Sequence, residues 1–179
     1  MYLVDSHCHL DGLNYETLHD GVDSVLADAR ARGVGFVLAV ATTLPGYRSM
    51  RERIGERRDV AFSCGVHPLN LEEGYDYGAL RSLAAQPGVV ALGETGLDYY
   101  YQQDNIVLQQ DSFRQHIRIG RALGKPVIVH TATRGMIRWR SCARRGRRRA
   151  AACCTALPRI VRRRRRCWIS GFISPSPAS

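Results

Sequence analysis

Several features of membrane, secreted and fibrous proteins are missing from this sequence of 179 residues. It has no apolar run of about 18 residues that could cross a bilayer. Its first residues, MYLVDSHCHL, lack the basic start and apolar stretch of a secretion signal. Its content of 45% hydrophobic and 23% charged residues excludes a disordered or fibrous polymer and is typical of one globular domain. We therefore expect a cytoplasmic protein with no membrane partner.

Acidic residues are absent from one end of the chain. Residues 132–179 contain 14 Arg and four of the six cysteines, but no Lys, Asp, Glu or His. Residues 1–131 contain 12 Lys and Arg and all 16 acidic residues, so their formal charge is 12 − 16 = −4. The net charge of +10 is thus a property of the last 48 residues. We divide the chain into a domain at 1–131 and an Arg-rich tail at 132–179.

Short apolar runs rich in β-branched residues recur through the first region. They span residues 2–4, 34–41, 60–63, 89–92 and 126–129. Because these runs are continuous rather than alternating, they indicate parallel strands that are covered on both faces. Their starts lie about 25 to 35 residues apart, which is the size of a βα unit, and a barrel of eight such units needs about 250 residues. We therefore predict an α/β fold of the (β/α)8 TIM-barrel type, of which this chain has about the first five units.

The stretches between these runs have helical periodicity. The first one carries apolar residues from Leu18 to Ala29, and the fourth carries them from Ile106 to Leu123, before the stop signals Gly124 and Pro126. We expect His19 and His116, which lie on these stretches, to be solvated surface residues.

Ionisable side chains follow the predicted strands at their carboxyl ends. They are His7 and His9 after the first, His67 after the third, Glu94 and Asp98 after the fourth, and His130 after the fifth. In a barrel of parallel strands these ends converge on one face, where active sites are built. Imidazole and carboxylate ligands suit Zn, Mn or Mg, and a carboxylate such as Glu94 can bridge two ions. Two divalent ions would favour cleavage of phosphate esters.

Two of these residues keep alternative interpretations. His67 could be a structural histidine at the end of a strand, a metal ligand, or a residue that supports the ligands or binds phosphate. Asp98 could orient its neighbours in the mouth of the barrel or cap the next helix.

Four motifs resemble those of the TatD-type metal-dependent deoxyribonucleases, which are relatives of the amidohydrolases. The motifs are HCHL at 7–10, GVHP at 65–68, GETGLDYYY at 93–101 and PVIVHT at 126–131. The resemblance covers residues 1–131 and implies a divalent-metal hydrolase that cleaves phosphodiester bonds in DNA. It implies that His7, His9, Glu94 and His130 are metal ligands, and Glu94 is our candidate catalytic residue. Two family elements, an LHCF-like motif after strand six and ETDSP after strand eight, do not occur in this sequence.

The tail has two competing explanations. Its arginines could form a nucleic-acid-binding arm, which would make the protein a non-enzymatic binder of nucleic acid. Alternatively, residues 132–179 are a coding sequence read out of frame. Codons compatible with Cys153 to Ile160, read from the third base of each codon, give L-H-C-F-T-E-D, which restores the missing LHCF-like motif. Loss of one base near codon 131 would produce this shift, so we predict a poorly ordered tail.

Three functions therefore compete at this stage. The first is a deoxyribonuclease of the TatD type, truncated and frameshifted in this chain and hence of marginal stability and weakly active or inactive. The second is nucleic-acid binding through the tail, and the third is an amidohydrolase acting on a small cyclic amide. DNA is the predicted substrate of the first function, and no specific protein partner is predicted.

Overall fold

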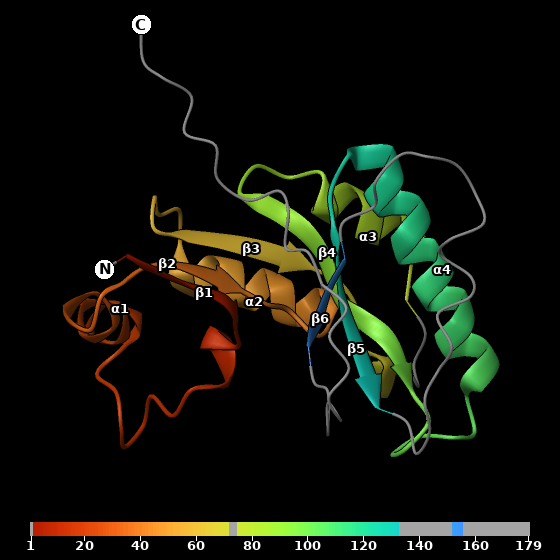
Figure 1. Ribbon diagram of the computed structural model, residues 1–179, viewed down its shortest axis with the longest axis horizontal. Helices are drawn as coiled ribbons and strands as arrows, with labels where there is room; N and C mark the ends of the chain where they lie inside the picture. The colour runs from red at the N-terminus through yellow and green to blue at the C-terminus, as the bar shows by residue number, and fades with distance from the viewer. Residues whose placement is uncertain (1, 72–74, 133–151, 156–179) are drawn as a thin grey trace, which may run out of the picture.

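A computed structural model describes residues 2–71 and 75–132 and the backbone of residues 152–155. Its six strands form one parallel sheet in the order β1-β2-β3-β4-β5-β6 (Figure 1). The strands are β1 (Leu3–Cys8), β2 (Val34–Ala39), β3 (Val60–Cys64), β4 (Val89–Asp98), β5 (Val127–Ala132) and β6 (Ala152–Thr155). The helices between them are α1 (Val22–Ala31), α2 (Leu44–Ile54), α3 (Tyr77–Ala84) and α4 (Ile106–Leu123), and short 3-10 turns follow β1 and β3 at Leu10–Gly12 and Pro68–Asn70.

The described elements confirm the α/β fold that the sequence predicts. Each of the five apolar runs is a strand, and the strands are neighbours in chain order, as in the opening half of a (β/α)8 barrel. β1 continues to Cys8 and β4 to Asp98, beyond the apolar runs that predicted them. As a result, the polar residues expected just after these strands form their carboxyl ends.

The sixth strand was not predicted. β6 lies in the Arg-rich tail and pairs in parallel with β5, with Thr155 opposite His130. The sequence predicts about five units, so β6 is one strand more than expected. Residues 133–151 and 156–179 lie outside the described residues, and so does the prediction that they are poorly ordered.

The main core lies between the sheet and the helices. It contains large side chains from both, including Tyr47, Met50, Phe62, Leu80 and Leu92, each at most 2% exposed. A second, smaller cluster of Val40, Ala91 and Ile128 packs separately. Since Ala91 and Leu92 are adjacent in β4, the two clusters lie on opposite faces of the sheet. Burial on both faces explains why the strands are continuous apolar runs.

Capping residues fix where the helices begin and end. Thr43 accepts a hydrogen bond from the Gly46 N–H at the start of α2, and Asp76 accepts one from Gly78 at the start of α3. Gly124 ends α4 with a φ of 67°, as the sequence predicts. The first helix begins at Val22, so Leu18 and His19 lie in the preceding loop and Leu18 is 72% exposed. Among the described residues, no helix is both long enough and apolar enough to cross a membrane.

Candidate metal centre

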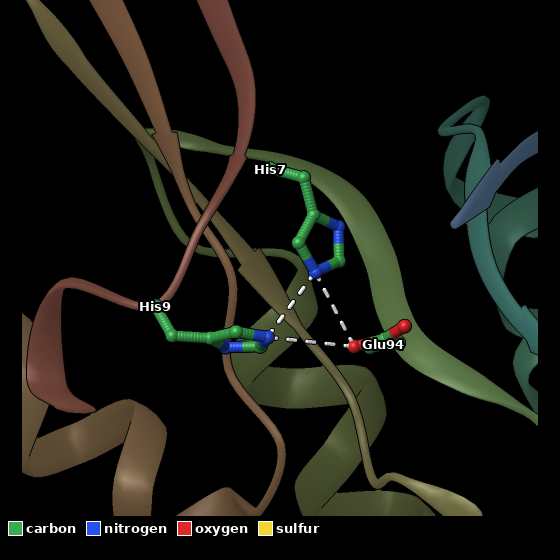
Figure 2. A group of neighbouring side chains, drawn as sticks. All are labelled: His7, His9 and Glu94. Carbon is green, nitrogen blue, oxygen red and sulfur yellow. Dashed lines mark hydrogen bonds and ion pairs between the residues drawn. The ribbon is translucent and has the colours of Figure 1, made fainter. Parts of the chain in front are cut away.

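The two histidines of the first motif meet at the end of β1. His7 is the penultimate residue of the strand and His9 follows it, so their side chains leave the chain on the same side. Their Nε2 atoms lie 3.2 Å apart (Figure 2). A tetrahedral ion with bonds of about 2.0–2.1 Å separates two nitrogen ligands by roughly 3.4 Å. The spacing of the two rings is therefore that of two ligands of one ion.

Glu94 reaches this pair from β4. Its Oε2 lies 3.4 Å from Nε2 of His7 and 3.7 Å from Nε2 of His9 (Figure 2). The Glu94 side chain is only 6% exposed. A buried carboxylate is costly unless positive charge compensates it, which a bound cation or protonated histidines would do. The donor set of two imidazoles and one buried carboxylate thus fits a divalent ion.

Glycines allow β4 to place Glu94 at this point. Gly93 and Gly96 have φ values of 129° and 146°, which L side chains rarely adopt. A Cβ on Gly93 would lie 2.6 Å from the carbonyl oxygen of Ile128, and one on Gly96 would lie 2.0 Å from that of His130. The backbone N–H of Glu94 donates to the carbonyl of Ala41, beyond the neighbouring strand β3. The GETG sequence therefore lets the strand bend inward and carry the carboxylate to the ends of β1 and β2.

His130 at the end of β5 approaches the other oxygen of Glu94. Its Nδ1 lies 3.6 Å from Oε1, and its Nε2–H donates to Oδ2 of Asp98 over 3.0 Å. Burial alone would lower the pKa of His130, but the hydrogen bonds and negative charges of Glu94 and Asp98 outweigh it and raise the pKa. When His130 is neutral, its proton stays on Nε2 beside Asp98, and the lone pair of Nδ1 then faces Glu94.

Asp98 has one of the two roles that the sequence left open, together with a turn-capping role that was not foreseen. Its side chain is fully buried, and Oδ2 orients His130. Its Oδ1 accepts hydrogen bonds from the backbone N–H groups of Tyr100 and Tyr101. It therefore caps the turn after β4 and not the helix α4, whose N-cap is Asn105.

His67 lies beside His130 in the same cluster. The two rings are T-shaped with centroids 4.2 Å apart, and ligand atoms of His67, Glu94 and His130 all lie within 4.8 Å of one another. Burial, together with the neighbouring His130, lowers the pKa of His67 to about 4. His67 is thus a neutral imidazole at physiological pH.

The expectation that His116 is a surface residue is wrong. His116 is fully buried on α4, and burial lowers its pKa to about 4. Its Nε2 accepts from the backbone N–H of Val66 over 3.1 Å, and its Nδ1–H donates to the carbonyl of Ser112 over 2.8 Å. Its Nδ1 also lies 3.2 Å from the hydroxyl of Thr95. The buried ring of His116 thus links α4 to Val66, which precedes His67, and to Thr95, which follows Glu94.

The sequence contains a weak signal for the buried face of α4. The buried residues of α4 are Gln109, Ser112, His116, Ile119 and Gly120, which recur every three or four positions. Most of them are polar, so the apolar pattern of Ile106, Phe113 and Ile117 pointed to a neighbouring stripe, whose residues are only partly buried.

Parallel strands whose carboxyl ends bring two histidines of an HXH motif, a glutamate and a further histidine together define the class of barrel-type metal-dependent hydrolases. Comparison with known families agrees, because the family described as TatD related DNase matches residues 4–150. The chain belongs to the TatD family, which confirms the resemblance seen in the motifs. The match continues past residue 131, where we divided the chain.

Individual relatives are similar over about half of their own length. The chain is 69% identical over 131 residues to the uncharacterized metal-dependent hydrolase YcfH of Escherichia coli K12, covering 73% of this chain and 49% of YcfH. It is 37% identical over 112 residues to the 3'-5' ssDNA/RNA exonuclease TatD of Cronobacter turicensis, covering 60% of this chain and 42% of that protein. The crystal structure of the TatD homologue YjjV from Escherichia coli K12 superposes with a TM-score of 0.63 at 25% identity, covering 72% of this chain and 50% of YjjV.

Proposed function

We propose that this site binds two divalent ions, of Mg, Mn or Zn, and serves the hydrolysis of phosphodiester bonds in DNA. The observation that carries the proposal is the placement of Glu94 between two groups of ligands. Its Oε2 faces His7 and His9, whereas its Oε1 faces His130. A carboxylate with one oxygen on each side is suited to bridge two ions. Glu94 is therefore both a ligand and the candidate catalytic residue.

Hydrogen bonds from the protein prepare the imidazoles for this role. Nδ1–H of His9 donates to the carbonyl of Val40 over 2.9 Å, which leaves the Nε2 lone pair facing Glu94. Asp98 does the same for His130 by accepting from Nε2–H. Divalent ions held there would polarise a phosphoryl oxygen and increase the acidity of water. The protein itself fixes the ligand orientations and keeps Glu94 buried.

DNA as the substrate is supported by the family description and by a relative named as an exonuclease on single-stranded DNA and RNA. The location in the cytoplasm stays a prediction from the sequence. We also propose that this 179-residue chain is weakly active or inactive, because its sequence contains neither LHCF nor ETDSP. By the resemblance to the TatD family, those motifs would supply a further histidine ligand and the aspartate that orients or deprotonates the attacking water.

A substrate panel tests the proposal. The purified chain is incubated with Mn2+ and a single-stranded oligodeoxynucleotide, bis(p-nitrophenyl) phosphate or a small cyclic amide. We expect slow hydrolysis, restricted to the two phosphodiesters and abolished by EDTA and by Glu94→Gln. Hydrolysis of the cyclic amide alone would favour the amidohydrolase alternative. Rapid metal-dependent DNA cleavage would contradict the proposed weak activity.

The charge of the tail favours a second candidate, non-enzymatic binding of nucleic acid. Its 14 arginines, including the run at 162–166, would bind any polyanion by releasing counterions. Such binding requires no metal and no contribution from Glu94. DNA affinity that is unchanged by EDTA but falls steeply with salt would support this candidate.

A further inference from the structure

His67 differs from His9 and His130 in the direction of its hydrogen bond with the protein. His9 and His130 each donate an N–H to a protein oxygen, which leaves the lone pair of the other nitrogen facing Glu94. At His67 the direction is reversed, because Nδ1 accepts a hydrogen bond from the backbone N–H of Leu69 over 3.2 Å. A neutral imidazole that accepts at Nδ1 carries its proton on Nε2.

This protonation state makes His67 a poor metal ligand. A neutral histidine binds a metal through the nitrogen that has no proton, and the partner of the other nitrogen decides which one that is. At His67, the free lone pair is already used by Leu69. His67 therefore brings an N–H donor into a cluster in which His9 and His130 present lone pairs.

The backbone around His67 is held on several sides. The backbone N–H of His67 donates to the carbonyl of Thr42 over 2.8 Å, and that of Val66 donates to the buried ring of His116. The ring of His67 also packs on the ring of His130. A donor that the protein already holds in place loses little conformational entropy when it binds an anion.

We propose that His67 is the oxyanion-binding residue of this site and that its Nε2–H donates to a non-bridging oxygen of a phosphate group held at the metal centre. The proposal rests on the proposed function, since a phosphate must bind beside Glu94 and His130. In this proposal His67 is not a metal ligand, although its ring lies beside Glu94 and His130.

Two binding measurements on the full chain test this role. Equilibrium dialysis counts Mn2+ ions, and broadening of the 31P signal gives the affinity of the Mn2+-loaded protein for inorganic phosphate. We expect His67→Ala to leave the number of ions unchanged and to weaken phosphate binding about tenfold, the effect of roughly one hydrogen bond to a charged group. His67→Gln retains an N–H donor and should recover part of the affinity. His19→Ala, which changes a histidine in the loop before α1, is the matched control and should change neither quantity.

The outcomes separate the possible failures. Loss of an ion in His67→Ala would show that His67 is a ligand and would overturn the proposal. An unchanged phosphate affinity would leave His67 only the role of capping the turn at Pro68–Asn70 and would also overturn it. If the unsubstituted chain binds no Mn2+, the proposed function itself fails, and the donor role fails with it.

A measurement without substitutions covers the case in which the variants do not fold. Two-dimensional 1H–15N spectra of the zinc-loaded, histidine-labelled chain report which ring nitrogen of each histidine carries the proton. We expect a proton on Nε2 of His67. A proton on Nδ1 of His67 would overturn the proposal.

Discussion

The two regions of this chain differ in almost every property that relates sequence to function. Residues 1–131 are net acidic, and their described parts fold into alternating strands and helices. They place His7, His9, His67, His130 and Glu94 at one end of the sheet. Residues 132–179 have 14 arginines and no acidic residue or histidine. The overall charge of +10 would point to nucleic-acid binding, whereas the folded region points to metal-dependent hydrolysis. The comparison shows that an average over a heterogeneous chain can misdirect a functional assignment.

β6 belongs to the Arg-rich tail but is part of the same sheet as the strands of the first region. It pairs with β5 in parallel, at the place where strand six of a barrel belongs. In the shifted reading frame, the histidine of the LHCF-like motif arises where the codons of Cys154 and Thr155 meet, and Thr155 is the register partner of His130. The restored histidine would therefore stand beside His130 at the carboxyl ends of the strands. The out-of-frame origin of the tail stays a prediction, and this register supports it.

The largest effect is expected at Glu94, because His7, His9 and His130, the other proposed ligands, all face its carboxylate. Glu94→Gln removes the negative charge and should weaken Mn2+ binding more than about 100-fold, beyond the 10 to 100-fold that supporting residues contribute. Isothermal titration of the full chain measures this. Glu52→Gln, an exposed glutamate on α2, is the control. Unchanged Mn2+ affinity in Glu94→Gln would contradict the placement of the metal site in residues 1–131.

A smaller loss is expected at Asp98, because it contacts the proposed metal site only through His130. In Asp98→Asn the amide is a weaker acceptor for Nε2–H of His130, so Mn2+ affinity should fall roughly tenfold. The same titration checks it, with exposed Asp104→Asn as the control. Equal affinities in the two variants would mean that Asp98 only caps the turn after β4.

The tail should affect DNA binding without affecting the metal site. Replacing the five arginines at 162–166 with glutamine should weaken binding of single-stranded DNA and flatten its dependence on salt. Fluorescence anisotropy of a labelled oligonucleotide at several salt concentrations measures both effects. The Mn2+ affinity of this variant should match that of the unsubstituted chain. A parallel loss of metal binding would show that the two regions act together.

The smallest effect is expected on stability in mild acid. The pKa of His116 is about 4 in the folded chain and about 6.5 when unfolded, so the unfolded state binds more protons between these values. The stabilisation is complete above about pH 6.5 and is lost as the pH falls toward 4. At pH 5 the loss amounts to about 2 kcal/mol. His116→Gln should therefore reduce the drop in Tm between pH 7 and pH 5. An identical drop in both proteins would exclude His116 as a cause.

The sequence was most informative where apolar runs and polar strand ends follow each other. It predicted five strands and the convergence of His7, His9, Glu94 and His130, because parallel strands bring their carboxyl ends to one edge. It did not predict the burial of His116, since a polar residue on a helix ordinarily faces solvent. That burial depends on partners far along the chain, such as Val66 and Thr95.

Other errors also arose from tertiary context. Leu18 continued an apolar helical pattern, yet the helix begins only at Val22. β4 extends through Gly93 and Gly96, residues that weaken a strand unless backbones approach closely, as they do here at Ile128 and His130.

The most direct test is to restore one base between codons 131 and 132 and assay the resulting protein on single-stranded DNA with Mn2+. If residues 1–131 hold an incomplete TatD-type site, the restored chain should cleave DNA at least about 100-fold faster than the 179-residue chain, and EDTA should abolish the reaction. A restored chain that gains no metal-dependent cleavage would contradict both the out-of-frame tail and the assignment of this site to phosphodiester hydrolysis.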